Sequence, residues 1–203
     1  AEGEDTEFTR IDMDVEVMDI TIRAGEDYGV EYAGNRKEAE PTISISDGTL
    51  VVTQKMKQRW RSMNNVRCEL IITVPSDVVL DDLTVTANVG DVDIENVEIT
   101  NLDVTSDVGD VDVENVSVED GKIILDVGEF DMEQCSFTDL DVTCDMGDVE
   151  INSVNDLSEY RIQLNCDMGS VCVNGKDQRN SFVQEGEQGS LKVSNSLGDI
   201  DVN

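Results

Sequence analysis

A glycine recurs in this chain at a fixed spacing, each time in nearly the same surroundings. The clearest copies read LTVTANVGDVDIENVEI, LDVTSDVGDVDVENVSV and LDVTCDMGDVEINSV. The first four glycines lie 19 residues apart, and the last two gaps are 22 and 29 residues. A constant period in this range is typical of a solenoid, in which each coil buries its apolar face only against its neighbours. The glycines are Gly90, Gly109, Gly128, Gly147, Gly169 and Gly198.

Within each repeat the apolar residues alternate with polar ones, and most of them are β-branched, which predicts short strands. Two or three strands per coil, each paired with its counterpart in the next coil, describe a β-helix filled by stacked Val and Ile. Leucine-rich repeats are excluded because the helical half is missing, and propeller blades because they need about 40 residues. We therefore expect an all-β, single-domain β-helix or solenoid with coils of roughly 19 residues. The predicted inward columns are Val85, Val104, Ile123, Val142, Leu164 and Val193 five residues before the glycine; Val92, Val111, Phe130, Val149, Val171 and Ile200 two after it; and Ile94, Val113, Met132, Ile151, Val173 and Val202 four after it.

The residues between these columns are acidic around every glycine. The glycine is expected at a corner, because a residue without a Cβ lets the chain turn tightly between two strands. The acids alternate with the inward columns and are therefore predicted to point outward. They are Asp107, Asp126, Asp145 and Asp167 two residues before the glycine; Asp91, Asp110, Glu129, Asp148 and Asp199 one after it; and Asp93, Asp112, Asp131, Glu150 and Asp201 three after it.

The chain divides into an irregular strand-rich part at 1–80 and regular repeat coils at 81–203, which we expect to form one domain over 1–203. The first part still alternates in IDMDVEVMDITI, PTISISDGTLVVTQ and RCELIITVP, and turn residues separate these runs. A basic segment, KMKQRWRSMNNVR at 55–67, interrupts it and is expected to form a long loop or hairpin. A second insertion, NGKDQRNSF at 174–182, carries an Asn-Gly turn signal.

The charge balance excludes several classes of partner. The 203 residues include 46 acidic and 14 basic side chains, for a formal net charge of −32. Nucleic acid is not expected as a partner, because a binder must neutralise phosphates with Lys and Arg. Anionic membranes and polyanionic sugars would be repelled for the same reason. The hydrophobic content of 38% is nevertheless enough for a folded core.

The residue types present also exclude several kinds of catalytic and metal site. The chain has no histidine, which removes the usual general base and the commonest zinc ligand. Its five cysteines form no CxxC pair, so neither a disulfide framework nor a zinc ribbon is indicated. No apolar run approaches the roughly 20 residues that span a bilayer. Because the chain begins AEGEDTEF without a methionine, we expect that it follows a signal or membrane anchor in the natural protein.

The chain resembles the bacterial putative-adhesin family, a domain of unknown function with repeated GD motifs. The resemblance rests on the order of four segments: an opening like IDMDVEVMDITI, then SISDGTLVV, then ELIITVP, and then tandem LxVTxxxGDVxV coils. The resemblance covers almost the whole chain. It implies an extracytoplasmic β-helical domain, often behind an N-terminal membrane anchor, with a surface or adhesive role. Some members look like parts of cell-envelope stress systems, and the family offers no catalytic residues. The third coil departs from the pattern, with Gly121 in place of leucine and GEF in place of GDV.

The acid columns suggest one cofactor, calcium, which would be held by Asp91, Asp93, Asp110, Asp112 and Asp148. Like charges about 4.8 Å apart in adjacent coils repel by roughly 0.9 kcal/mol in water and about 3.5 kcal/mol at an effective dielectric near 20. Hard cations bridged by carboxylate oxygens would relieve this repulsion. The alternative, which we favour, is a solvated face whose charge is screened by salt. The known calcium-binding β-helix repeat has a nine-residue period and glycine-rich turns, unlike this chain.

The hypothesis that the acids catalyse hydrolysis has less support than the hypothesis of calcium binding. Polysaccharide-cleaving enzymes also use β-helices. Because acids stand at every outward position of this chain, however, some pair of carboxylates at a catalytic separation would be found in any case, and such a pair is no specific sign of catalysis. We expect a non-enzymatic protein. Cys144 and Cys166 occupy the same position in their repeats and are expected to stack in neighbouring coils, as a small-residue column or, less favoured, as a disulfide.

The basic segment has two readings as well. Arg59, Trp60 and Arg61 could dock on a partner, since Trp and Arg dominate interface hot spots. The segment could instead fold back over the acidic solenoid or shield an open strand edge, which we favour slightly. At the other end, the chain stops at GDIDVN with a complete rung, which could pair with a second molecule in an end-to-end homodimer.

From the sequence we therefore expect a surface-exposed or secreted, extracytoplasmic domain of adhesin type. It would present a rigid acidic face, with specificity in the loops at 55–67 and 174–182, to a glycan or protein ligand. The alternative is a cell-envelope stress sensor or scaffold domain that binds a membrane component or a partner protein.

Overall fold

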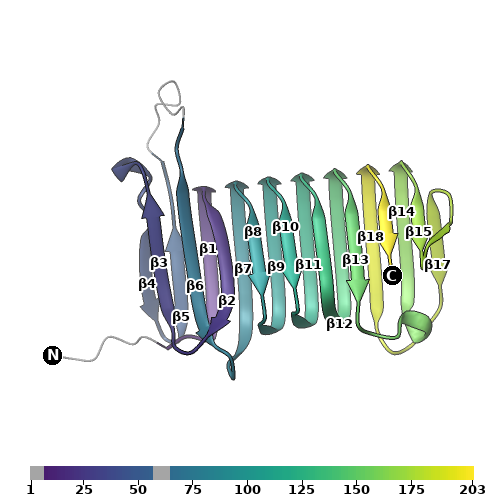
Figure 1. Ribbon diagram of the computed structural model, residues 1–203, viewed down its shortest axis with the longest axis horizontal. Coiled ribbons are helices and arrows are strands. Elements are labelled where there is room, and N and C mark those ends of the chain that lie inside the picture. Colours follow the sequence, from purple (N-terminus) through teal and green to yellow (C-terminus); the bar gives the residue numbers. More distant parts are fainter. Residues whose placement is uncertain (1–6, 57–64) are drawn as a thin grey trace.

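The computed structural model describes residues 7–56 and 65–203, and their regular structure consists of β-strands (Figure 1). The only helical elements in this part of the chain are two short 3-10 turns, Lys37–Ala39 and Leu157–Glu159. The prediction of an all-β fold is confirmed. Neither described stretch contains a helix long and apolar enough to cross a membrane.

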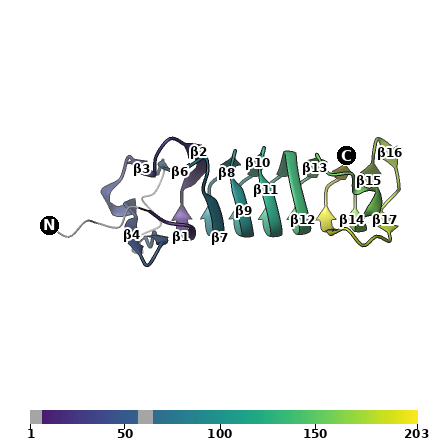
Figure 2. The same ribbon diagram turned by 90° about the horizontal axis from the view of Figure 1, so that it is seen from below.

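The strands form two sheets that face each other across the core (Figure 2). Most neighbours within each sheet are parallel, and the outermost pair at each end is antiparallel. Sheet A runs, in spatial order, β4 (Thr42–Ser46), β5 (Thr49–Thr53), β1 (Arg10–Val17), β7 (Val79–Val89), β9 (Glu98–Val108), β11 (Ser117–Val127), β12 (Phe130–Met146), β18 (Ser190–Leu197), β14 (Arg161–Met168) and β17 (Ser181–Gln184). Sheet B runs β3 (Gly29–Gly34), β6 (Cys68–Pro75), β2 (Asp19–Gly25), β8 (Val92–Glu95), β10 (Val111–Glu114), the start of β12, β13 (Val149–Ser153), β19 (Ile200–Val202), β15 (Val171–Val173) and β16 (Lys176–Asp177).

A strand of sheet A and the strand of sheet B that follows it along the chain form one rung. Adjacent rungs from β7 to β13 pair residues 19 positions apart, as in Val92 with Val111 and Val111 with Phe130. The register therefore places like residues on top of each other. Alternation along each strand then sends every second side chain inward, and all three predicted apolar columns are buried.

The order of the rungs in space differs from their order in the sequence at both ends. The rung β1/β2 lies between β5/β6 and β7/β8. Likewise β18/β19, which is last in the chain, lies between β12/β13 and β14/β15. The expectation that the GDIDVN rung ends the stack is therefore wrong: its backbone is paired on both sides, so it offers no edge for an end-to-end homodimer.

Antiparallel strands close the stack instead. At one end β4 pairs with β5 and β3 with β6, and at the other β17 pairs with β14 and β16 with β15. The 174–182 insertion supplies the second of these caps, and its Asn174-Gly175 turn has the positive φ values of 49° and 69° that the sequence signal predicts. The last parallel strands are thereby paired, and the sheets end instead in short antiparallel edge strands, which are poor templates for pairing with other chains.

The corner glycines are required by their position between rungs. Gly109 has φ +147°, and a Cβ on it would lie 2.0 Å from the carbonyl oxygen of Gly90 in the preceding rung. Gly128 stands in the same relation to Gly109. No other residue fits, because the backbones touch where the chain turns from sheet A into sheet B.

Candidate functional site

The acids that follow the corner glycines form a ladder of hydrogen bonds along the stack. Oδ1 of Asp91 accepts the backbone N–H of Asp110 at 3.0 Å, and Oδ1 of Asp110 accepts that of Glu129 at 2.8 Å. Oδ1 of Asp19 serves Asp91 in the same way at 3.2 Å. Each carboxylate thus satisfies a backbone donor that the turn leaves outside the sheet ladder.

The ladder continues across the rung inserted from the end of the chain. Oδ1 of Asp148 accepts the backbone N–H of Asp199 at 2.8 Å. Oδ1 of Asp199 in turn accepts the N–H of Ser170 at 2.7 Å and its hydroxyl at 2.9 Å. These bonds from Ser170 lower the pKa of Asp199. The acids of the four GD pairs, Asp91, Asp110, Asp148 and Asp199, therefore have a structural role, which also explains why the GD pair repeats.

The acids three residues after the glycines behave differently. Asp93, Asp112 and Asp131 stack directly in sheet B. Partial burial between the rungs, followed by repulsion from Asp93 and Asp131, raises the pKa of Asp112 to about 6. Burial and then neighbouring acids also raise the pKa of Asp93 and of Asp131. Oδ1 of Asp131 is buried and has no hydrogen-bond partner in the described structure. Protons can thus relieve the repulsion in this column without a metal ion.

For the predicted calcium ligands, the structure divides the set in two. Asp91, Asp110 and Asp148 each commit one oxygen to a backbone N–H, whereas Asp93 and Asp112 lie in the column with raised pKa. Within residues 7–56 and 65–203, no group of three or more Asp, Glu, Cys or His side chains is arranged to hold a metal ion. Calcium binding stays a prediction.

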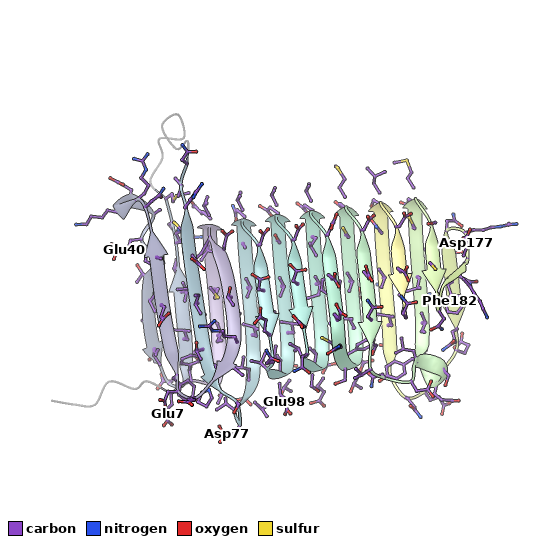
Figure 3. The ribbon with its side chains drawn as sticks, viewed as in Figure 1. Glu7, Glu40, Asp77, Glu98, Asp177 and Phe182 are labelled. Carbon is purple, nitrogen blue, oxygen red and sulfur yellow. The ribbon has the colours of Figure 1, made fainter. Side chains whose placement is uncertain are left out.

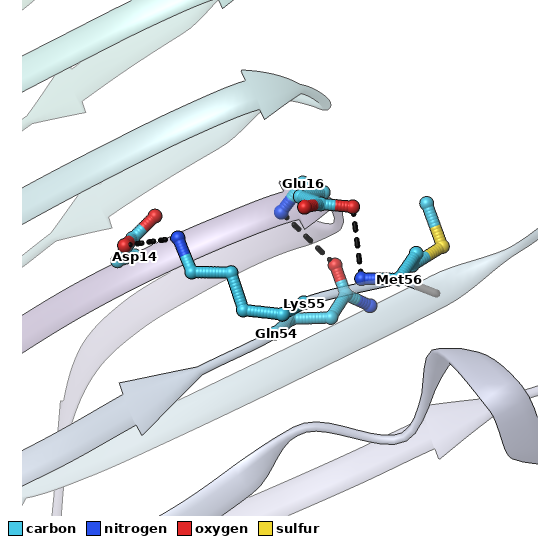
Figure 4. A network of polar contacts seen from close by, with 5 residues as sticks. All are labelled: Asp14, Glu16, Gln54, Lys55 and Met56. Atoms are coloured by element: carbon cyan, nitrogen blue, oxygen red, sulfur yellow. Dashed lines mark hydrogen bonds and ion pairs between the residues drawn. The ribbon is translucent and has the colours of Figure 1, made fainter. Parts of the chain in front are cut away.

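The predicted ligand-binding residues Arg59, Trp60 and Arg61 lie outside the described residues. The described start of their segment is fixed to β1 (Figure 4). Lys55 Nζ lies 2.5 Å from Asp14 Oδ2, and Glu16 Oε2 accepts the backbone N–H of Met56 at 2.9 Å. The buried Gln54 accepts the backbone N–H groups of Glu16 and Val17 at 3.1 and 2.8 Å. Residues 54–56 are therefore firmly anchored to β1.

The two predicted stacked cysteines are not neighbours. In sheet A Cys144 pairs with Asn195, and Asn195 pairs with Cys166, so one strand lies between the two thiols. The separation of about 9.6 Å across two strand spacings rules out a disulfide. Burial raises the pKa of Cys144 and of Cys166. The expectation of adjacent coils is wrong because β18 is inserted between them.

Gly121 marks a feature that sequence reasoning did not place. It stands between Leu102 and Leu140 in the sheet A register, and a Cβ on it would lie 2.8 Å from Cδ1 of Leu140, so a neighbouring core side chain already occupies its space. A shallow groove of about 440 Å³ includes Gly121 in its lining. The polar groups on its rim bind one another: Lys192 Nζ lies 3.3 Å from Asp141 Oδ2, and Ser190 Oγ donates to Asp139 Oδ1.

Comparison with protein families gives one match that spans nearly the whole chain. Residues 8–203 fit the family described as Toastrack DUF4097. No curated protein matches the chain.

Two solved structures share the fold. The crystal structure of a "putative cell adhesion protein" from Clostridium sporogenes is 15% identical, covers 98% of this chain and 95% of its own, and superposes with a TM-score of 0.58. That of a "putative adhesin" from Bacteroides fragilis is 18% identical, covers 97% and 93%, and has a TM-score of 0.54. At these identities the likeness establishes the architecture.

Proposed function

We propose that this chain, which belongs to the Toastrack DUF4097 family, is a non-enzymatic β-solenoid displayed on the cell surface or secreted. It acts as an adhesin, presenting an acidic face to a glycan or protein ligand outside the cytoplasm. The names of the two similar structures, a cell adhesion protein and an adhesin, support this role by analogy.

One observation carries the proposal: sheet B presents the same acids in the same register on successive rungs. Asp93, Asp112 and Asp131 repeat at a spacing of about 4.8 Å. The neighbouring ladder from Asp91 to Glu129 fixes the corners by hydrogen bonds. A ligand with regularly spaced donors or cations can engage several rungs together, and such multivalent contact raises avidity without any deep pocket.

The same repetition favours binding over catalysis. A hydrolytic enzyme needs one pair of carboxylates whose environments differ from those of all other acids. In sheet B, burial and like-charged neighbours shift the pKa of Asp93, Asp112 and Asp131 in the same direction. These acids therefore resemble parts of one surface more than an acid and a base with separate roles.

The test is equilibrium binding of the purified chain to immobilised mucin, to matrix proteins and to lipid vesicles, in calcium and again in EDTA. Saturable binding to a matrix protein, or to mucin when calcium is present to bridge the two anionic surfaces, is the expected result, and loss in EDTA would assign the binding to a metal-bridged acid column. Trp60→Ala serves as the control for the basic segment. Binding to vesicles alone would favour the envelope sensor or scaffold, and binding to nothing would overturn the adhesive role.

A further inference from the structure

An exposed row of apolar side chains runs along the corner edge of the stack. It consists of the residues directly before the corner glycines, which we call the corner ridge: Val89, Val108, Val127, Met146, Leu197 and Met168, in spatial order. These side chains are between 42% and 64% exposed. Figure 3 shows side chains projecting along this edge, where the long sheet A strands end.

The ridge exists because the strand alternation breaks at the corner. In β9, Val104 and Ser106 point inward, but Asp107 and Val108 are both exposed before the chain turns at Gly109. Because the break recurs in each rung, the apolar side chains stack in parallel register. Six positions at about 4.8 Å per rung give a continuous ridge of roughly 24 Å.

Rows of acids lie on both sides of the ridge. On the sheet A side stand the residues two before each glycine, and on the sheet B side the ladder of acids that follow it. Neither row is neutralised by an ion pair among the described residues, whose salt bridges are Lys55–Asp14 and Lys192–Asp141. The first row contains Asp107, Asp126, Asp145 and Asp167, and the second Asp91, Asp110, Glu129, Asp148 and Asp199.

A contiguous exposed apolar strip with a polar border marks an interaction surface. Its borders restrict the partner. A second copy of this chain, or an anionic membrane, would bring negative charge against negative charge. The complementary surface is an apolar stripe flanked by Lys and Arg.

The backbone at the ridge restricts the partner further. The N–H of Gly109 donates to the carbonyl of Val127 at 3.0 Å, and that of Gly90 donates to the carbonyl of Val108 at 3.0 Å. Because these groups are already paired between rungs, an added β-strand would find no free edge. The partner must therefore bind through its side chains, as an amphipathic helix does.

We propose that the corner ridge docks a cationic amphipathic helix of about 16 residues, the length that spans roughly 24 Å at 1.5 Å per residue. Its apolar stripe lies on the valines and methionines, and its basic flanks face the two acid rows. This inference deepens the proposed function and rests on it, since it names one surface and one class of partner for a binding domain.

The test uses a synthetic 18-residue helical peptide of Leu and Lys with one apolar stripe, and a scrambled peptide of the same composition. Binding to the purified chain is measured by fluorescence anisotropy. We expect saturable binding of the striped peptide and much weaker binding of the scrambled one. Equal binding of the two would overturn the proposal, because it would reduce the interaction to charge alone.

Matched variants locate the site. Val89→Thr, Val108→Thr and Val127→Thr together should weaken peptide binding by about tenfold or more, since each adds a hydroxyl to the apolar contact. Thr keeps the β-branched shape, so the fold is retained. Val79→Thr, Val154→Thr and Val183→Thr make the same change at exposed valines elsewhere and should leave binding unchanged. An equal loss in both triple variants would overturn the proposal.

The acid rows are tested in the same way. Asp107→Asn, Asp126→Asn and Asp145→Asn should weaken peptide binding and reduce its salt dependence. Glu7→Gln, Asp77→Asn and Glu98→Gln remove the same charge at the opposite edge, where Figure 3 labels them, and should have little effect. If both sets of substitutions weaken binding equally, the peptide is attracted by the negative charge of the whole protein, and the proposal of a site at the corner ridge is overturned. Retained binding to mucin or matrix protein by the chain would then leave the adhesive role standing without this inference.

Discussion

Oδ1 of Asp91 accepts the backbone N–H of Asp110, one rung further along the stack, at 3.0 Å. The carboxylate thus replaces the carbonyl that a sheet partner would supply at this point. The same contact links Asp110 to Glu129 and Asp148 to Asp199. The acid in each GD pair is therefore part of the framework of the rod.

Removing the acceptor should destabilise the corner. We expect Asp110→Ala to lower the free energy of unfolding by about 1 kcal/mol, since the N–H of Glu129 loses its partner. Asp110→Asn should lower the free energy of unfolding by less, because its amide oxygen can still accept this hydrogen bond. Urea unfolding measures both, with Asp107→Ala as the control. A loss in the control as large as in Asp110→Ala would show that the ladder contact is not the cause.

Adding a methyl group at a corner should be more damaging. A Cβ at position 128 would lie 2.0 Å from the carbonyl oxygen of Gly109, and φ there is +152°. We expect Gly128→Ala to destabilise the fold by about 3 kcal/mol or more. Gly175→Ala is the matched control, because φ is +69° there but no atom lies within 4 Å of the added Cβ. Equal melting temperatures for the two variants would contradict the close packing of the corners.

The stacked acids of sheet B predict an unusual dependence of stability on pH. The folded pKa of Asp112, about 6, lies above its unfolded value near 3.9. The folded state therefore holds the proton more tightly, and this contribution to stability is complete below pH 4 and is lost as the pH rises through 6. Asp112→Asn should raise stability at pH 7 and flatten the urea-unfolding profile between pH 4 and 6. An unchanged profile in this variant would contradict the assignment, with Asp107→Asn as the control.

The thiols should differ sharply in reactivity. Cys172 is half-buried, whereas Cys68, Cys135, Cys144 and Cys166 are buried. We expect a maleimide to label Cys172 quickly in the folded protein and the other four only after unfolding. Cys172→Ser should abolish the fast phase. Recovery of a Cys144–Cys166 disulfide after mild oxidation, identified by mass spectrometry, would contradict the insertion of Asn195 between them.

Alternation and glycine spacing were enough to predict the strands and the three inward columns. They could not predict the order of the rungs, because Val142 finds an equally suitable partner in Leu164 or in Val193. The structure pairs it with Val193, 51 residues away. The antiparallel strands β16 and β17 pair with β15 and β14 and thereby take the outer position beside them, and these irregular segments carry no repeat pattern that the sequence could show.

The surface was less predictable than the core. All acids around the glycines looked alike in the sequence, yet Asp110 binds a backbone N–H while Asp112 is crowded by other acids. The sequence did not predict the corner ridge, because strict alternation along the strand would place Val108 inward, like Ser106. Its exposure follows from two consecutive outward residues, a detail of the turn that needs coordinates.

In the proposed function, the acidic face of sheet B is the binding surface. The most direct test compares Asp93→Asn, Asp112→Asn and Asp131→Asn, combined in one variant, with Glu7→Gln, Asp77→Asn and Glu98→Gln in equilibrium binding to immobilised mucin and matrix proteins. We predict saturable binding by the unaltered chain and by the second variant, and at least about tenfold weaker binding by the first. If the unaltered chain does not bind saturably, or if both variants bind equally, the proposal that the acidic face of sheet B is a binding surface is contradicted.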